Sequence, residues 1–306
     1  MNFEPSDDQA SVLAGLDSLL AAYRDAPHEA VHHVYSESLR SDLEDGGYLD
    51  VATMDGFGPL DAALIIERVA RLPVVTELAA SALIKPILPT AISAGPLALA
   101  YGGAQHPIRY LPVARTLLVV EGDDVSVMDL PPGAVKPEDS LLAYPYGKLL
   151  PQGKEAASAP AHLAAVRRRW QIGLACEAAG CMAAALELVV EHVKNRVAFR
   201  RPLGSFQAIQ HRLAMAAKVV EATKWLAFRA AWSDADADAA IAAGYSQNHV
   251  AQFTYDLHQF TGAMGLTLEF PLHLWTYRLR ALCGELGGGR AQALEAASAV
   301  WGDRAA

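Results

Sequence analysis

One uninterrupted run, AHLAAVRRRWQIGLACEAAGCMAAALELVVEHVKNRVAF (161–199), constrains the fold of this chain most, because it continues for more than thirty residues without proline. As a single helix it would be roughly 50 Å long at about 1.5 Å per residue. Pro202 and Gly204 end it. A helix of that length is more often part of a core scaffold than a functional site, so we first treat it as scaffold.

Further helices follow the long run. A second begins near Ser205, a third spans roughly 239–261, a fourth follows Pro271, and Gly287–Gly289 separates it from a last one. Long helices joined by short connections are typical of an antiparallel bundle. We therefore predict a C-terminal bundle of four to five helices over residues 156–306.

The first part of the chain, residues 1–88, is also predicted to be helical. Ser6 is a plausible N-cap followed by two aspartates, which suit the first turn of a helix. The run PLDAALIIERVARLP ends at Pro73, and the run VVTELAASALIKP stops at Pro86. An N-terminal helical domain is the expectation.

Residues 89–155 have a different texture, with frequent Pro, Gly and Tyr. Two short runs rich in β-branched residues, 115–122 and 124–131, predict two strands joined by a Gly-Asp-Asp turn. The predicted fold class is therefore mainly α with a small, shortened central β domain.

Composition excludes several classes of protein. With 52% hydrophobic residues over 306 positions the chain can bury a large core. Its net charge of -9 argues against general nucleic-acid binding, which needs a basic face. Three cysteines do not make a disulfide framework and favour a reducing compartment. An acidic N-terminus without an apolar signal core, and no obvious membrane span, lead us to expect a cytoplasmic protein.

The segment NRVAFRRPLGSFQAIQHRLA (195–214) is unexpectedly basic for an acidic chain. Arg196 falls in the last turn of the long helix, where a cation also interacts favourably with the helix dipole. Arginine side chains can equally bind a phosphate or pyrophosphate in a bidentate way. Gln207 and Gln210 begin the next helix, whose free N–H groups suit a polar ligand. The residues alone leave both interpretations open.

Two motifs resemble the signatures of the acyl-CoA dehydrogenase family. RVAFRRPLGSFQAIQHRLA (196–214) is similar to R-x-x-F-G-x-P-(I/L)-x-x-F-Q-x-x-Q-H-x-(L/M)-A. HQFTGAMGLTLEFPLHLWTYR (258–278) is similar to the family's Q-x-H-G-G-x-G-(F/Y)-x-x-E-(Y/H)-P stretch. GYLDV (47–51) and LIIERVAR (64–71) also fit its opening helices. The resemblance implies a helical domain, a central β domain and a helical bundle, with FAD between subunits.

The resemblance also implies roles for five residues. Arg196 would reach the FAD pyrophosphate of a neighbouring subunit, and Phe199 and Gln207 would lie at the flavin nucleotide. Gln259 and Gly262 would lie near the adenosine end.

The chain departs from the family pattern within both motifs. Arg200 stands where the family prefers glycine, and Thr261-Gly262-Ala263 replaces its His-Gly-Gly.

The carboxylate that acts as base in this family has no counterpart here. The resemblance places it either on the long helix, where Trp170 and Gln171 stand, or before a glycine, where Leu286 stands. Glu285 is adjacent, but one helical step rotates a side chain by about 100°. Glu285 could serve only if the chain turned differently there, and we assign no catalytic residue.

The middle domain also lacks the family's T-E-P-x-x-G-S-D loop, and AISAGPLALAYGG is the nearest segment in place. This combination resembles the small, degenerate subunit of heterotetrameric steroid or sterol side-chain acyl-CoA dehydrogenases. The expected partner is a larger acyl-CoA dehydrogenase subunit, with FAD shared at the interface and an acyl-CoA thioester as substrate. Two alternatives remain: an independent homo-oligomeric enzyme with Glu285 as base, and a flavin-free scaffold or CoA-ester binder.

Other candidate sites are weaker. HEAVHH (28–33) has a Glu-x-x-His spacing but no second copy of it, and Asp234-x-Asp236-x-Asp238 lacks the later glycine and glutamate of a calcium loop, so we expect no metal. Cys176 and Cys181 are expected in the core, and Arg167–Arg169 is expected at a charged helix start, with a CoA phosphate contact as the alternative.

Overall fold

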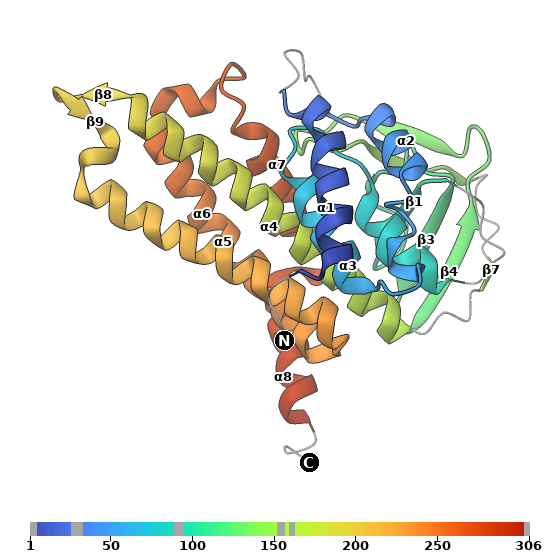
Figure 1. Cartoon of the computed structure of the whole chain (residues 1–306). Helices are drawn as coiled ribbons and strands as arrows, with labels where there is room; N and C mark the ends of the chain where they lie inside the picture. Colours follow the sequence, from blue (N-terminus) through green and yellow to red (C-terminus); the bar gives the residue numbers. More distant parts are fainter. Residues whose placement is uncertain (1–4, 26–32, 89–94, 152–156, 159–162, 303–306) are drawn as a thin grey trace.

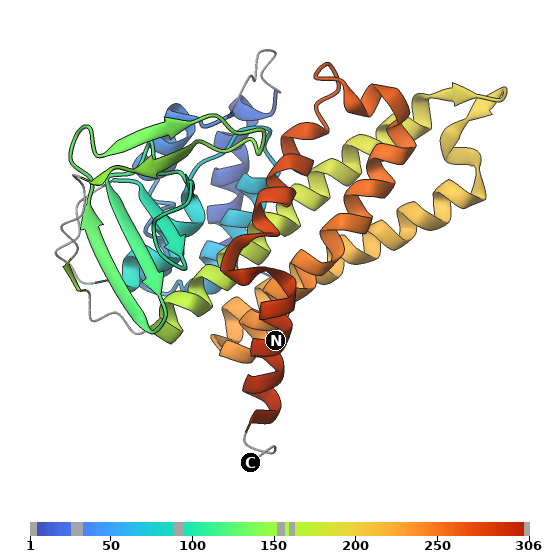
Figure 2. The ribbon, with the colours of Figure 1, turned by 180° about the vertical axis from the view of Figure 1, so that it is seen from behind.

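The computed structural model describes residues 5–25, 33–88, 95–151, 157–158 and 163–302. A helical part, a strand part and a helix bundle follow one another along the chain. In Figure 1 the bundle extends to the left and the strands close the right-hand side, with the N-terminal helices between them, and Figure 2 shows the same arrangement from behind. The predicted fold class, mainly α with a small β region, is confirmed.

The N-terminal helices begin as their sequences predict. Ser6 caps the first helix: its hydroxyl accepts from the Gln9 N–H at 3.2 Å, and its own N–H donates to the Gln9 side chain at 2.9 Å. A second helix, which sequence analysis missed, is short and begins after the cap Ser36. The helices are α1 (Asp7–Leu20), α2 (Glu37–Asp45) and α3 (Pro59–Ala70). The predicted third helical run is helical only from residue 78, and it consists mainly of a π-helical segment, η3 (Ala80–Ile84), and a 3-10 turn, η4 (Lys85–Ile87).

Two small sheets form the strand part. The first has the order β1-β3-β4-β7, from β1 (Leu97–Tyr101), β3 (Thr116–Glu121), β4 (Asp124–Asp129) and β7 (Ala157–Ser158). The second has the order β2-β6-β5, from β2 (Ile108–Arg109), β6 (Tyr146–Leu149) and β5 (Val135–Glu138). The predicted hairpin is β3–β4, whose turn has Gly122 in the left-handed region at φ 61°.

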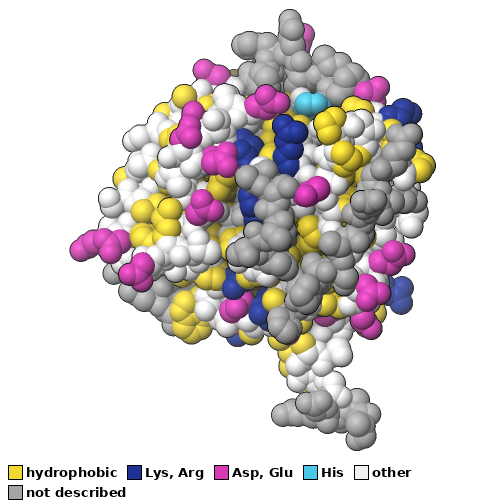
Figure 3. Space-filling view, turned by 90° about the vertical axis from the view of Figure 1, so that its right-hand side faces the viewer, with side chains coloured by type: hydrophobic (Ala, Val, Ile, Leu, Met, Phe, Trp, Pro, Cys, Tyr) yellow, Lys and Arg dark blue, Asp and Glu magenta, His cyan; other side chains and the backbone are white. Residues whose placement is uncertain are grey.

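The bundle contains the long helix and four others. They are α4 (Leu163–Asn195), α5 (Gln207–Ser233), α6 (Asp236–Thr261), α7 (His273–Leu282) and α8 (Gly288–Trp301). A two-stranded hairpin of β8 (Val197–Ala198) and β9 (Arg201–Pro202) joins α4 to α5, and α8 projects from the body of the molecule (Figures 1 and 3). We call the end of the bundle that carries this hairpin the bundle tip.

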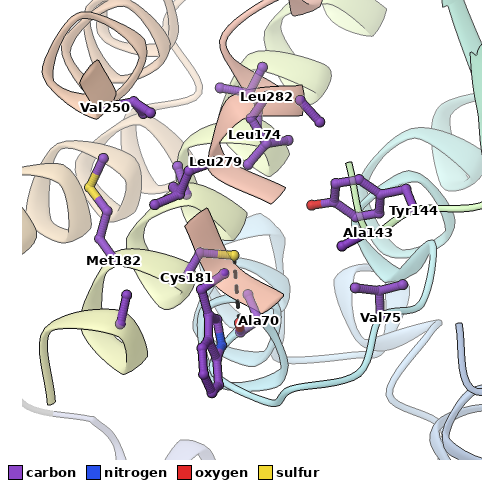
Figure 4. Packing of buried hydrophobic residues seen from close by; sticks show 14 of the residues in the cluster. Ala70, Val75, Ala143, Tyr144, Leu174, Cys181, Met182, Val250, Leu279 and Leu282 are labelled. Atoms are coloured by element: carbon purple, nitrogen blue, oxygen red, sulfur yellow. Dashed lines mark hydrogen bonds between the residues drawn. The ribbon is translucent and has the colours of Figure 1, made fainter. Parts of the chain in front are cut away.

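Helix α4 is the centre of the core and packs against α3, α5, α6 and α7. Its small residues permit close approach: a Cβ on Gly180 would lie 2.2 Å from the carbonyl oxygen of Glu67 in α3. Figure 4 shows Leu174 and Cys181 of α4 packed among residues of α7 and of the strand part, with the Cys181 thiol 3.7 Å from the Ala70 carbonyl. The predicted core placement of Cys176 and Cys181 is confirmed, since both are fully buried.

The same helix is the one described element long and apolar enough to span a membrane, a property that sequence analysis overlooked. In this fold 89% of its most apolar stretch is buried against other parts of the protein. Its hydrophobicity is therefore explained by its place at the centre of the core.

Candidate functional site

The hairpin at the bundle tip is a tight turn with two left-handed residues. Val197 pairs with Pro202 and Ala198 with Arg201, which leaves Phe199 and Arg200 at the turn with φ of 53° and 65°. Two positive φ angles are typical of a type I′ turn, which favours glycine. The family preference for glycine at the Arg200 position thus has a backbone reason, and here an arginine adopts that conformation.

Arg196 is held by its backbone and leaves its side chain exposed. Its N–H donates to the His192 carbonyl at 2.8 Å, and its carbonyl accepts from the Leu203 N–H at 2.9 Å. Its guanidinium has no ion pair with any residue that the structure describes. Burial, and then the positive charge of Arg196, lower the pKa of His192. An arginine whose backbone is hydrogen-bonded and whose guanidinium has no partner is suited to bind an anion from another molecule.

The aromatic residues beside Arg196 are also presented outward. The side chain of Phe199 is 85% exposed, and its ring meets that of Phe206 edge-on at 6.1 Å. Arg201 stacks over the Phe206 ring at 3.8 Å. Gln207 begins α5 and is exposed, whereas the Gln210 amide is occupied by the Gly204 carbonyl at 2.7 Å. A helix N-terminus with free N–H groups therefore adjoins exposed aromatic and basic side chains.

The second motif ends α6 at the same end of the bundle. Gln259 lies exposed in its last turn, and Gly262 follows with φ 59° and ψ -144°, a conformation that an L-residue rarely adopts. A Cβ on Gly262 would contact nothing within 4 Å. Phe270, beyond this turn, stacks edge-on against His192 of α4 at 5.3 Å, which ties the two motifs together.

The fold thus brings all five predicted site residues to the bundle tip, at the ends of α4, α5 and α6: Arg196, Phe199, Gln207, Gln259 and Gly262, all exposed. Among the described residues the three polar side chains of this set make no hydrogen bond of their own. An unpaired guanidinium, two free amides and a helix N-terminus fit the pyrophosphate and nucleotide groups of FAD offered from outside.

The two positions at which a base was sought converge at the other end of the long helix. Trp170 is 5% exposed, and its indole N–H donates to Glu285 Oε2 at 2.8 Å. Gln171 points away, donating to Gln292 at 2.6 Å. Leu286 is buried and left-handed at φ 54°.

The left-handed conformation of Leu286 continues through Gly287 and Gly288, with φ of 81° and 75°. The chain therefore does turn differently after Glu285, and the Glu285 carboxylate enters the pocket beside Trp170. The geometric condition for Glu285 to approach a substrate is met.

The Glu285 carboxylate is nevertheless already bound. Arg109 of β2 forms an ion pair with Glu285, whose Oε1 lies 2.7 Å from its Nε, and donates from Nη1 to Glu177 Oε2 at 2.8 Å. The Tyr144 hydroxyl donates to the other oxygen of Glu177 at 2.7 Å, and Figure 4 shows the hydroxyl turned toward α4. We call Trp170, Glu285, Arg109, Glu177 and Tyr144 the junction cluster, because they join the strands, α4 and η8 (Glu285–Gly287).

Electrostatics keep the junction cluster charged. Burial opposes the charge of Glu177, but Arg109 and then Arg278 outweigh burial and lower the pKa of Glu177. Burial likewise opposes the charge of Arg109, but the carboxylates of Glu177 and Glu285 raise the pKa of Arg109 well above its ordinary value. With its pKa lowered, the Glu177 carboxylate is a poor proton acceptor for catalysis.

The pocket around the junction cluster is nearly filled. Its polar wall includes a third carboxylate, Glu77, which accepts from Arg40 at 2.8 Å and from Tyr35 at 2.9 Å. The space left among the lining side chains holds about one water molecule. An acyl chain would not fit without rearrangement.

Sequence analysis missed Arg109, Glu177 and Tyr144. Glu177 did carry a signal: it is a lone carboxylate between Ala and Cys on an apolar helix, and a buried charge is almost always paired. It lies seven residues, or two turns, after Trp170 and therefore on the same face of α4. Nothing in the sequence pointed to Arg109 as its partner.

The other candidates form ordinary contacts. Arg168 pairs with Asp234 at 2.9 Å and with Asp236 at 2.6 Å, and Arg169 pairs with Asp234 at 3.1 Å. These pairs explain both the arginine run and the aspartate turn. No cluster of three or more His, Cys, Asp or Glu suited to a metal occurs in the described ranges. Most of HEAVHH, residues 28–32, lies outside them.

The chain resembles known proteins mainly through its bundle. Residues 168–297 match the family model "Acyl-CoA dehydrogenase, C-terminal domain". Acyl-CoA dehydrogenase FadE34 of Mycobacterium tuberculosis is 35% identical over 122 residues, which cover 38% of this chain and 17% of that protein. Acyl-CoA dehydrogenase IpdE2 of the same organism is 30% identical over 128 residues, 42% of this chain and 40% of that protein. The matches thus span less than half of either relative.

Solved structures match over nearly the whole chain at low identity. The ChsE4-ChsE5 complex from Mycobacterium tuberculosis has a TM-score of 0.78 at 18% identity, covering 96% of this chain and 97% of that one. The butyryl-CoA dehydrogenase of Megasphaera elsdenii has a TM-score of 0.77 at 19% identity, covering 98% and 100%. A Tcur3481-Tcur3483 steroid ACAD variant has a TM-score of 0.78 at 19% identity, covering 98% and 99%. Together the matches support the acyl-CoA dehydrogenase family for the bundle and its fold for the whole chain.

Proposed function

We propose that this chain, which has the acyl-CoA dehydrogenase fold, completes the FAD site of a larger catalytic subunit in a cytoplasmic α2β2 complex. The complex would catalyse α,β-dehydrogenation of an acyl-CoA thioester. Its bound FAD would accept the hydride, and the residues of this chain would bind and orient the nucleotide part of the FAD. The proposal rests mainly on one contrast within the chain. The polar side chains of the predicted site at the bundle tip are exposed and have no hydrogen-bond partners among the described residues, whereas the pocket at the junction cluster has little free space.

The bundle tip has what an external nucleotide requires. Arg196 is exposed and has no carboxylate partner among the described residues, so a pyrophosphate would meet no competing anion. The Phe199 ring is 85% exposed, and contact of this apolar surface with water is unfavourable unless another molecule covers it. These exposed groups lie at the C-terminal end of α4, whereas the chain's own pocket lies near the N-terminal end of that helix, so another molecule could reach them.

The chain's own centre lacks a free base. Both oxygens of Glu285 are engaged: Oε2 accepts a hydrogen bond from Trp170, and Oε1 forms an ion pair with Arg109. The presence of Glu285 in the pocket favours the independent enzyme as a second candidate. Its binding by Arg109 makes that candidate the weaker one.

Exposed apolar side chains on the bundle support association with another subunit. Helix α8 projects from the body (Figure 3), and its Leu294, Val300 and Trp301 are 64%, 47% and 58% exposed. Trp232 at the end of α5 is 57% exposed as well. Exposed tryptophans and large aliphatic side chains are typical of subunit interfaces.

The substrate class follows by analogy. One structural neighbour is a steroid ACAD, and another is a complex of two differently named chains. A steroid side-chain ester of CoA is therefore our first choice of substrate, and a second copy of this chain is the alternative partner.

The test is flavin content. We expect the chain purified alone to be colourless, and its complex with a longer acyl-CoA dehydrogenase subunit to show the flavin absorbance bands with stoichiometric FAD. Arg196→Ala should weaken FAD binding by the complex about 10- to 100-fold, since a hydrogen bond to a charged group contributes about 1.5–3 kcal/mol. Arg280→Ala, which removes an exposed cation from α7, is the matched control.

Two outcomes would overturn the proposal. A full flavin complement in the chain alone would favour the independent enzyme. A complex that keeps all its FAD after Arg196→Ala would favour a scaffold or CoA-ester binder that does not touch flavin.

A further inference from the structure

The junction cluster resembles a cation-binding site in which a side chain of the same protein, Arg109, supplies the cation. One guanidinium, that of Arg109, bridges carboxylates that come from two separate elements, Glu177 of α4 and Glu285 of η8. It also lies over the rings of Tyr144 at 4.7 Å and Tyr110 at 5.0 Å. Its side chain is 12% exposed, against 8% for Glu177 and 15% for Glu285.

We infer that the pocket at the domain junction is a guanidinium site occupied by Arg109, which closes it to acyl thioesters. The inference rests on the proposed function, because it explains why this chain would leave dehydrogenation to a partner. It names the ligand class that the pocket recognises: a flat organic cation with several N–H donors.

The geometry favours a guanidinium over other cations. Nη1 donates to Glu177 at 2.8 Å, and Nε forms an ion pair with Glu285 at 2.7 Å, so two nitrogens of one group reach two carboxylates in a fork, which a single ammonium nitrogen does not reproduce. Aromatic rings flank the group, and planar guanidinium groups stack well on them. A lysine at position 109 would keep the charge and lose the fork.

Arg109 is also the group that keeps the two carboxylates together. Arg278, 1% exposed, also helps to lower the pKa of Glu177, but its Nη1 donates to the Leu72 carbonyl at 2.8 Å and it forms no ion pair with Glu285 among the described residues. Without Arg109, Glu285 would keep the Trp170 N–H and Glu177 would keep the Tyr144 hydroxyl. Two buried carboxylates facing each other without a bridging cation are strongly unfavourable.

Shortening Arg109 should create a cavity that its own head group fits. The cavity would have carboxylates at one end and the apolar lining residues Leu97, Leu99 and Leu174 at the other. Ethylguanidinium has the head group and part of the stem of the missing side chain, so it should bind there.

Thermal unfolding of the full chain tests the inference. Arg109→Ala should lower Tm by roughly 10 °C, the size expected for a broken buried ion pair. Ethylguanidinium chloride at 10 mM should restore several degrees, and sodium chloride at the same concentration should restore none. Arg71→Ala is the matched control, because Arg71 pairs with Glu67 and Glu187 but is 38% exposed; ethylguanidinium should not raise its Tm.

Two further measurements keep the inference open to contradiction if Arg109→Ala does not fold. Arg109→Lys should have a Tm clearly below that of the unsubstituted chain, and equal values would overturn the forked bridge. Butyryl-CoA should not raise the Tm of the unsubstituted chain, and protection by it would show that the pocket admits an acyl thioester.

These outcomes are separable from the flavin test. A complex that binds FAD through Arg196 while Arg109→Ala is as stable as the unsubstituted chain would retain the proposed function and overturn the guanidinium site. A complex that keeps all its FAD after Arg196→Ala, while Arg109→Ala is destabilised and restored by ethylguanidinium, would overturn the proposed function and retain the guanidinium site.

Discussion

Arg196 at the bundle tip and Arg109 in the junction cluster are the same residue type in opposite surroundings. The first is exposed and has no described carboxylate partner, and the second is 12% exposed with two. A charge inside a protein must be paired there, because burial without a partner is very costly. A charge at the surface stays available, so the exposed arginine is the one suited to binding another molecule.

The largest effect that separates the two regions should come from Glu177→Gln. This change leaves Arg109 without one of its carboxylates and should lower the free energy of unfolding by about 3–5 kcal/mol, as for a broken buried pair. Denaturant unfolding of the full chain measures it. Arg196→Ala, by contrast, should change the same free energy by less than about 0.5 kcal/mol.

Glu187→Gln is the matched control for Glu177→Gln. It makes the same substitution on the same helix, but Glu187 is 70% exposed and pairs with Arg71 at 3.3 Å. Exposed pairs contribute little, so its effect should be about 1 kcal/mol or less. Equal effects of the two substitutions would show that the junction cluster contributes no more than a surface ion pair.

A smaller effect is expected at the bundle tip from Gly262→Ala. The added Cβ has nothing within 4 Å to strike, so the cost comes from the backbone at φ 59° and ψ -144° and should be about 1–2 kcal/mol in unfolding. Gly284→Ala tests the same substitution where φ is -91°, and it should be close to neutral. A neutral Gly262→Ala would indicate that the turn after α6 relaxes freely.

The smallest expected effect is on the way the free energy of unfolding changes as pH falls from 7 to 3. The pKa of Glu177 is lowered in the folded chain, so its stabilisation is present above its unfolded pKa of about 4.3 and is lost as pH falls through the lower folded value. The pKa of His192 at the tip is also lowered, so its contribution is lost as pH falls below about 6.5. Unfolding free energies measured from pH 7 to pH 3 should therefore decline in two stages.

Substitutions assign the two stages. Glu177→Gln should flatten the lower one and leave the upper one, whereas His192→Gln should do the reverse. A single stage that neither substitution alters would mean that both regions contribute little to acid sensitivity.

Local signals predicted much of the fold. The N-cap at Ser6 and the β3–β4 hairpin depend on residues close together in the chain, and both predictions are confirmed. The long helix ends earlier than predicted, at Asn195, because Val197 and Ala198 pair with β9, so Arg196 lies just past the helix and not in its last turn. The missed elements share another cause. Helix α2 has only nine residues, and β2 only two, so neither carries a periodic pattern long enough to detect.

By itself, the sequence determined the order of the helical, strand and bundle regions and the content of the bundle tip, where Arg196, Phe199 and Gln207 stand within twelve residues of one another. Only the tertiary structure decided the junction cluster. Arg109 meets Glu177 across 68 positions of the chain, and Glu285 joins them through the left-handed turn at Leu286. The physical reason is that a buried charge selects whichever partner the packed elements bring within hydrogen-bond distance, and that depends on packing rather than on spacing in the chain.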